Sequence, residues 1–171
     1  MTLEELWELF PIVLVQYDPV WREWFREERA VLQRLFPDAD ITHIGSTAVP
    51  GIMAKPVVDI LIEFPSVAEM KLAASVMEGA GYIHMSCSPS RISMNKGYTE
   101  KGYAERVFHL HLRLRGDNAE ISFRDYLRAH PEAAQEYENL KKDLADRFRN
   151  NRDAYTEGKT EFIIRCSTTA P

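Results

Sequence analysis

The stretch THIGSTAVPGIMAKPVVDILIEF, from Thr42 to Phe64, decides the fold of this chain. It places a glycine–serine pair and two proline-containing turns ahead of a lysine, a single aspartate and an apolar strand. Side chains alternate between the two faces of a strand, so Val58, Ile60, Ile62 and Phe64 share one wholly apolar face. Val57, Asp59, Leu61 and Glu63 share the other. We therefore predict a strand inside a sheet, with Asp59 at the floor of a cleft and Glu63 near the exposed end of the strand.

The glycine–serine pair is the first candidate for a phosphate site. Gly45 and Ser46 follow the expected strand residues 41–44. A glycine lets backbone N–H groups approach a phosphate closely, and a serine adds a hydroxyl donor. A helical turn beginning at Ser46 or Thr47 would direct its positive end at the anion, and Lys55 would add a point charge. These residues predict phosphate or nucleotide binding by Gly45, Ser46, Thr47 and Lys55. The alternative is a strand-to-turn pair that binds no ligand.

Asp59 is the candidate metal ligand, because Mg²⁺ prefers carboxylate and water. A two-metal phosphoryl-transfer site usually needs a second carboxylate close by. Position 61, on the same face, is leucine. Glu63 lies about 13 Å along the strand, at roughly 3.3 Å per residue, and is too far away to share an ion with Asp59. Asp59 is thus predicted either to bind Mg²⁺ without a second carboxylate close by, or to be a buried hydrogen-bond acceptor.

A second alternating segment, from Arg106 to Arg115, is predicted to form the other wall of the cleft. Its polar face carries His109, His111 and Arg113. The two imidazoles are spaced to chelate a divalent metal with Asp59 as third ligand. They are equally suited to bind phosphate, to act as acid or base near neutral pH, or to serve a structural role. Arg113 is predicted to bind phosphate. His43 is either a further member of the group or a core histidine.

The whole chain has the composition of a soluble globular protein. Its 171 residues are 45% hydrophobic and 27% charged, with a net charge of −5. This charge gives no reason to expect general binding to nucleic acid or to anionic membranes. No apolar run reaches the 18 residues of a membrane span, and the acidic start of the sequence does not resemble a secretory signal. We expect a cytoplasmic location, and the oligomeric state is not predicted.

Periodicity and capping signals predict the remaining elements. The expected helices are residues 2–9 (with Thr2 and Glu5 as a capping box), 19–36, 65–79, 122–129, 131–150 and 152–166. Further strands are expected at 12–15, 82–85 and 91–96. The charged residues expected to close the cleft are Arg124, Asp125, Arg128, Lys141 and Lys159; the alternative is a solvated helix surface.

With these residues in place, the sequence resembles the GrpB family of small bacterial proteins, within the nucleotidyltransferase superfamily. The likeness extends over nearly the whole chain. It is carried by residues 17–19 with Trp21, residues 43–51 (HIGSTAVPG), 55–60 (KPVVDI), 108–111 (FHLH), 123–128 (FRDYLR), Tyr155 and Lys159. The resemblance implies an α+β fold, a mixed sheet flanked by helices. It implies one domain over residues 1–171, with a core at about 11–116 and C-terminal helices at about 117–168.

The resemblance also suggests roles for particular residues. In that superfamily a glycine–serine turn holds nucleotide phosphates, and two carboxylates spaced by one residue bind Mg²⁺. Gly45 and Ser46 match the turn and Asp59 matches the first carboxylate, whereas Leu61 occupies the place of the second. The fold expectation is therefore firmer than the expectation of nucleotidyl transfer.

Three functions remain open from the sequence. The first is a nucleotidyltransferase-like enzyme that acts on a nucleotide or another phosphorylated small molecule with Mg²⁺, with Asp59, His109 and His111 as catalytic residues. The second is a non-catalytic module that binds a nucleotide or an anionic metabolite, and Leu61 motivates it. The third is a metal-dependent hydrolase built on Asp59, His109 and His111.

Overall fold

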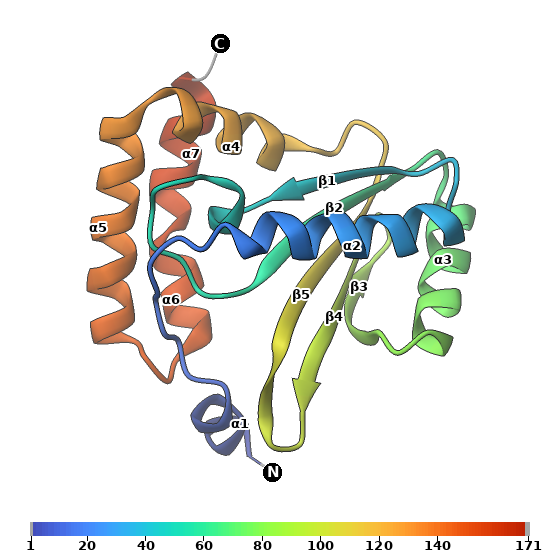
Figure 1. Cartoon of the computed structure of the whole chain (residues 1–171), viewed down its shortest axis with the longest axis horizontal. Helices are drawn as coiled ribbons and strands as arrows, with labels where there is room; N and C mark the ends of the chain where they lie inside the picture. The colour runs from blue at the N-terminus through green and yellow to red at the C-terminus, as the bar shows by residue number, and fades with distance from the viewer. Residues whose placement is uncertain (1, 170–171) are drawn as a thin grey trace.

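A five-stranded mixed β-sheet forms the centre of the computed structural model, which describes residues 2–169 (Figure 1). The strands are β1 (Asp40–Ile44), β2 (Val58–Phe64), β3 (Ile83–Ser88), β4 (Arg91–Thr99) and β5 (Gly102–Leu114). Their order across the sheet is β1-β2-β5-β4-β3. The central pair, β2 and β5, is parallel, and the other pairs are antiparallel. The predicted α+β class with a mixed sheet is confirmed.

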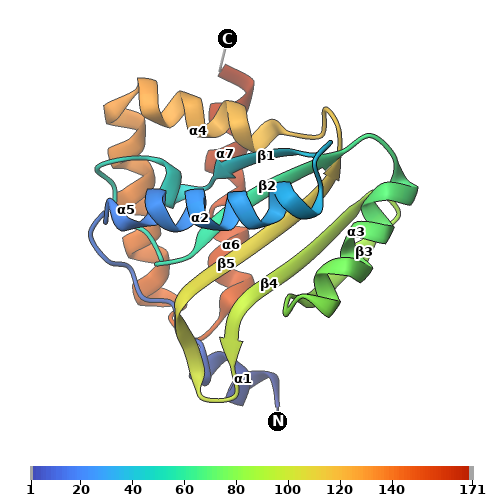
Figure 2. The same cartoon turned by 45° about the vertical axis from the view of Figure 1, so that its right-hand side comes forward.

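Helices cover the sheet unequally. They are α1 (Leu3–Leu9), α2 (Val20–Leu35), α3 (Val67–Gly79), α4 (Ala119–Ala129), α5 (Pro131–Arg147), α6 (Arg152–Gly158) and α7 (Thr160–Thr169), and Ser46–Ala48 form a 3-10 turn. α2 runs across one face of the sheet, and α3 packs beside it against the same face (Figures 1 and 2). Together they bury the apolar sides of β2 and β5 in the main core.

The alternation in β2 sets its register. Ile60 and Ile62 are fully buried in the main core with Leu110 and Leu112 of β5. Burying a side chain of this size contributes about 1.5–3 kcal/mol, and a one-residue slip would turn each of these side chains to the other face. The register therefore places Asp59 opposite His109 on the opposite face of the sheet. This pairing of Asp59 with His109 is the starting point of the candidate site described below.

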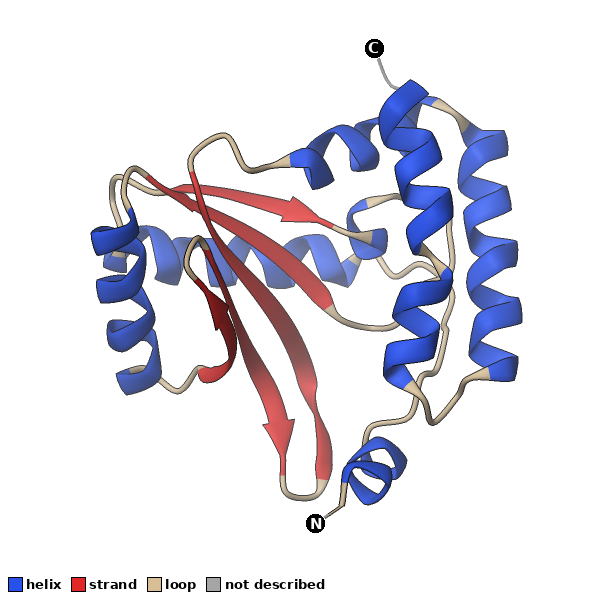
Figure 3. Ribbon diagram, turned by 180° about the vertical axis from the view of Figure 1, so that it is seen from behind, coloured by secondary structure: helices blue, strands red, loops and turns tan. Residues whose placement is uncertain are grey.

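The C-terminal helices lie beside the opposite face and the adjoining loop. α4, α5 and α7 share a second hydrophobic core with Val49 and Ile52, which follow the 3-10 turn. Seen from behind, α6 and α7 stand next to the sheet, and no helix drawn for the described residues lies in front of β4 and β5 (Figure 3). The polar face of the sheet is thus walled on one side only. No helix within residues 2–169 is both long and apolar enough to cross a membrane.

Most predicted elements are present, and two differ in an informative way. The capping box of Thr2 and Glu5 is confirmed, as is the 3-10 turn at Ser46. The predicted strand at residues 12–15 is wrong. Val15 makes one isolated bridge to Ala54, and the amide of Ile12 donates to a carbonyl beyond α5 instead. The predicted helix 152–166 is two helices, α6 and α7, separated at Lys159.

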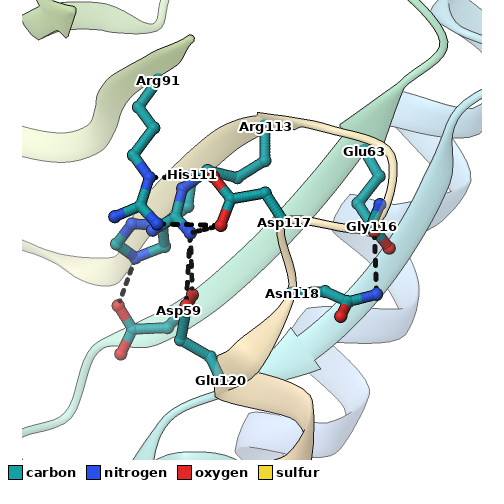
Figure 4. A network of polar contacts seen from close by, with 9 residues as sticks. All are labelled: Asp59, Glu63, Arg91, His111, Arg113, Gly116, Asp117, Asn118 and Glu120. Atoms are coloured by element: carbon teal, nitrogen blue, oxygen red, sulfur yellow. Dashed lines mark hydrogen bonds and ion pairs between the residues drawn. The ribbon is translucent and has the colours of Figure 1, made fainter.

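Glu63 corrects a further prediction. It is buried, with 5% of its surface exposed, and does not lie at an open strand end. Its carboxylate accepts hydrogen bonds from the amide of Gly116 and from the side chain of Asn118, at 2.9 and 3.0 Å (Figure 4). These two donors compensate for the loss of solvent, so Glu63 anchors the turn after β5.

Candidate functional site

A cavity of about 340 Å³ opens where the polar face of the sheet meets α5 and α6. The residues that line it come from five places in the fold. They are Gly45, Ser46 and Thr47 after β1; Lys55, Val57 and Asp59; His109 and His111 on β5; Tyr137 and Lys141 on α5; and Arg152, Tyr155, Thr156 and Lys159 on or just after α6. The structure thus brings the glycine–serine turn, the aspartate and the two histidines predicted from the sequence to one cavity of ligand size.

Gly45 is held where only glycine fits. Its backbone has φ 76° and ψ −175°, a region that residues with a side chain rarely adopt. A Cβ atom built at this position would lie 2.6 Å from Oδ2 of Asp59. The glycine therefore allows the turn to pass directly over the carboxylate, and Ser46 follows it at the edge of the cavity.

Asp59 is held by both histidines. Nε2 of His111 donates to Oδ1 of Asp59 at 3.1 Å, and Nδ1 of His109 lies 3.8 Å from the same oxygen (Figure 4 shows the His111 contact). Burial works against ionisation of Asp59, but the hydrogen bond from His111 and nearby positive groups lower the pKa of its carboxyl to about 2. The aspartate is therefore negatively charged at neutral pH.

Hydrogen bonds link α6 to His109, which lies beside Asp59. Burial lowers the pKa of His109 to about 4, so its ring is neutral at pH 7 and has one donor and one acceptor nitrogen. Nη2 of Arg152 donates to the hydroxyl oxygen of Tyr98 at 2.7 Å, and that hydroxyl lies 2.5 Å from Nε2 of His109. When the Tyr98 hydroxyl donates to Nε2 and accepts from Arg152, the proton of His109 is on Nδ1, the nitrogen nearer to Asp59 at 3.8 Å. Both histidines then serve chiefly to orient the carboxylate.

The cavity is rich in positive charge. Among the described residues, the ammonium groups of Lys55 and Lys159 have no hydrogen-bond or ion-pair partner. Both lie near the ring of Tyr155, at 5.2 and 4.6 Å from its centroid. Burial, together with repulsion from Lys159 and Arg152, lowers the pKa of Lys55 to about 7. Burial also lowers the pKa of Lys159, and Arg152 adds to this effect.

Lys141 has a different position. It is 2% exposed, and its Nζ donates to the carbonyl oxygen of Met53 at 2.6 Å. Burial lowers the pKa of Lys141 to about 7. The hydrogen bond to Met53 connects α5 to the segment before β2. Lys141 therefore both lines the cavity and holds these two segments together.

Several predicted site residues lie outside the cavity. Arg113 is 9% exposed, and its guanidinium forms an ion pair with Glu120 at 3.0 Å (Figure 4). It therefore does not point into the cleft as expected. Arg124 and Arg128 donate to the carbonyl oxygens of His43 and Ala48, and so hold the turn from its other side. Lys141 and Lys159 do line the cavity, as predicted.

His43 and Thr47 engage each other. The ring of His43 stacks on Phe25 with centroids 4.9 Å apart, and its Nε2 lies 2.9 Å from Oγ1 of Thr47. Burial lowers the pKa of His43 to about 4. His43 is thus the core histidine of the two alternatives, and the hydroxyl of Thr47 is already engaged.

The sequence interpretation missed Arg152, Tyr98 and any role for Tyr155. One signal was present for α6. Arg152, Tyr155, Thr156 and Lys159 are spaced i, i+3, i+4 and i+7, which places them on one helical face. All four line the cavity. A face with two cations and two hydroxyls at this spacing indicates a wall of a polar site.

The side chains present do not fit the magnesium site that the superfamily implies. Asp59 is the one carboxylate among the described cavity-lining residues, and it is already bonded to His111. Leu61 is fully buried, and Glu63 is bound to the turn after β5. Within residues 2–169, no three His, Cys, Asp or Glu side chains are grouped to hold a metal ion. Hence no chemical step is assigned to a metal here.

Comparison with known proteins agrees with this fold. The structure resembles Cid1 poly(U) polymerase, solved with Mg and 3′-dATP bound, with a TM-score of 0.54 and 14% identity over 91% of this chain and 51% of the other. The chain thus has the nucleotidyltransferase fold.

The family follows from closer likenesses. The GrpB protein family matches residues 11–168, and the chain belongs to this family. The crystal structure of GrpB from Enterococcus faecalis has a TM-score of 0.79 and 30% identity, covering 92% of this chain and 96% of that one. UPF0157 protein YqkA of Bacillus subtilis is 35% identical over 169 residues, 94% of this chain. The chain spans 48% of the length of YqkA.

Proposed function

We propose that this protein binds a phosphorylated small molecule of the nucleotide class in the cavity between the sheet and α6. The observation that carries the proposal is the imbalance of charge in the cavity wall. Lys55, Arg152 and Lys159 face one carboxylate, Asp59, which is itself occupied by His111. Burying unpaired cations in a partly enclosed space costs free energy unless an anion binds to them. Phosphate is a common anion that forms hydrogen bonds with both lysine and arginine.

The glycine–serine turn adds to this proposal. Ser46 lines the same cavity and has a hydroxyl that can donate to a phosphate oxygen. The cavity volume of about 340 Å³ lies within the range of small-molecule sites. The fold shared with Cid1, whose structure contains 3′-dATP, supports the nucleotide class.

Isothermal titration of ATP, GTP, CTP and UTP, each in excess MgCl₂ and again in excess EDTA, tests the proposal. We expect at least one nucleotide to bind, and Lys159→Met to weaken its binding by about tenfold or more, because a charge-assisted hydrogen bond contributes about 1.5–3 kcal/mol. Methionine keeps the apolar stem of the side chain against Tyr155. Lys71→Met is the matched control, because Lys71 is exposed on α3 and does not line the cavity. Absence of heat with all four nucleotides would refute the proposal.

Nucleotidyl transfer is the second candidate function. It is favoured by the position of Asp59, which lies directly beneath the glycine–serine turn on β2, an inner strand of a nucleotidyltransferase fold. Release of pyrophosphate from nucleoside triphosphates in the presence of Mg²⁺ tests it, with Asp59→Asn as the inactive control. Turnover by the wild-type protein that Asp59→Asn abolishes would establish transfer in place of simple binding.

A further inference from the structure

The charges on the cavity wall indicate how a phosphorylated ligand is held. In a metal-dependent site, carboxylates bind the cation and the cation binds the phosphates. Here, the described cavity wall has one carboxylate and four basic side chains: Lys55, Lys141, Arg152 and Lys159. A site for a divalent cation requires the opposite, with more carboxylates than basic side chains.

The cations of α6 are not neutralised by acidic neighbours. Nη2 of Arg152 donates to the hydroxyls of Tyr98 and Tyr103, at 2.7 and 3.3 Å, and both partners are uncharged phenols. Lys55 and Lys159 contact the face of Tyr155, which also carries no formal charge. No described buried side-chain nitrogen lacks a hydrogen bond, so the partnerless ammonium groups reach accessible space. They are in place to meet a ligand.

Two sets of donors lie in the same cavity but on different elements. Ser46 lies after β1, next to Asp59, whereas Arg152 and Lys159 lie at the two ends of α6. A water molecule occupies about 30 Å³ in the liquid, so a cavity of about 340 Å³ holds a ligand much larger than one phosphate. One phosphate cannot fill the cavity, and a linked pair or a longer chain fits its volume.

We propose that this cavity binds a chain of two or more phosphate groups directly on Lys55, Arg152 and Lys159, without a divalent cation. The inference rests on the proposed function and specifies it: the protein's own side chains supply the positive charge that the superfamily obtains from Mg²⁺. A divalent cation placed among these side chains would meet repulsion from all three and attraction from Asp59 alone.

The test compares inorganic phosphate, pyrophosphate and tripolyphosphate by isothermal titration, in excess EDTA and in excess MgCl₂. In EDTA we expect pyrophosphate to bind at least tenfold more tightly than phosphate. Added MgCl₂ should leave binding unchanged or weaken it, because Mg²⁺ neutralises the free ligand. Pyrophosphate binding that requires MgCl₂ would overturn the inference while leaving the proposed function intact, as would equal affinity for phosphate and pyrophosphate. Failure of every phosphate and every nucleotide would refute both.

Variants give a second, independent measurement. Lys55→Met and Lys159→Met should each weaken pyrophosphate binding by about tenfold to a hundredfold, whereas Lys71→Met should not change it. Thermal unfolding without ligand should show both cavity variants to be as stable as the wild type or more stable, since each loses an unpaired cation. A purely structural lysine would show the opposite, with lower stability on substitution and unchanged binding, and that result would also overturn the inference.

Discussion

Substituting Gly45 with alanine is the sharpest test of the geometry at the centre of the site. The backbone at Gly45 has φ 76°, and an added Cβ would lie 2.6 Å from Oδ2 and 3.1 Å from Cβ of Asp59. Two costs therefore combine. A residue with a side chain in this backbone region costs about 1–3 kcal/mol. Overpacking against Asp59 adds about 1–3 kcal/mol, because the obstacle is the base of a short side chain held by His111.

Gly51 separates these two costs. Its φ is 90°, and an added Cβ would have no atom within 4 Å. Gly51→Ala should therefore show the backbone cost alone. For a chain of this length about 1 kcal/mol lowers the melting temperature by about 2–4 °C. Gly45→Ala should therefore unfold roughly 2–12 °C below Gly51→Ala in a thermal melt followed by circular dichroism.

A double variant identifies the partner of the clash. Asp59→Ala removes Oδ2 but keeps Cβ, so the cost of Gly45→Ala should be smaller in the Asp59→Ala background than in the wild type. The coupling isolates the contact between these two residues from the backbone strain. If Gly45→Ala and Gly51→Ala melt at the same temperature, or if the double variant shows no coupling, the turn does not pass over the carboxylate as described.

Two further predictions concern charge in the cavity. Burial, with repulsion from Lys159 and Arg152, lowers the pKa of Lys55 to about 7 without ligand, whereas Asp59 opposes this shift. A bound anion raises the pKa. Below pH 7 the ammonium is already formed, whereas above pH 7 binding must take up a proton, so affinity for pyrophosphate should fall by up to about tenfold per pH unit towards pH 9. Isothermal titrations from pH 7 to pH 9 measure this dependence in the wild type and in Lys55→Met. The affinity of Lys55→Met should change less with pH, and equal slopes for the two proteins would contradict the prediction. Asp59→Asn keeps the shape of the side chain and removes its negative charge, so phosphate affinity measured by titration should stay the same or rise; loss of binding would refute a non-catalytic binding module.

The sequence predicts the sheet-borne half of the site well, for a physical reason. Asp59 and His109 lie on strands whose alternation is strict, and a buried apolar face allows a single register. The side from which each polar residue projects therefore follows from the pattern alone. That the two strands are neighbours does not follow from alternation; it was a hypothesis about the cleft, and the pairing of β2 with β5 confirms it.

The helix-borne half was harder to predict. Arg152 reaches the site only because α6 packs beside the sheet, a contact between elements far apart in the chain that no local pattern specifies. Arg113 shows the converse error. It lies on the expected polar face, but its charge is taken up by Glu120, the second residue of the helix that follows. Local alternation predicts the face on which a residue lies and does not predict its partner.

The predicted strand at residues 12–15 failed for a related reason. A run of four apolar residues is compatible with a strand, but a strand needs a neighbour with free backbone groups. In the fold the amide of Ile12 is taken by the carbonyl of Arg149, beyond α5, and only Val15 bridges to Ala54. The segment therefore ties the C-terminal helices to the region before β2 and adds no strand to the sheet.

Tyr98 joins the two halves of the site. It lies near the tip of the β4–β5 hairpin, accepts a hydrogen bond from Arg152, and meets Nε2 of His109. A ligand that draws Arg152 towards a phosphate would remove a hydrogen bond from the tyrosine hydroxyl, which is also the partner of His109. Because burial lowers the pKa of His109 to about 4, no proton need move for this to happen. Tyr98 therefore contacts both the cation that we propose to bind phosphate and the histidine that lies beside the single acid of the cavity.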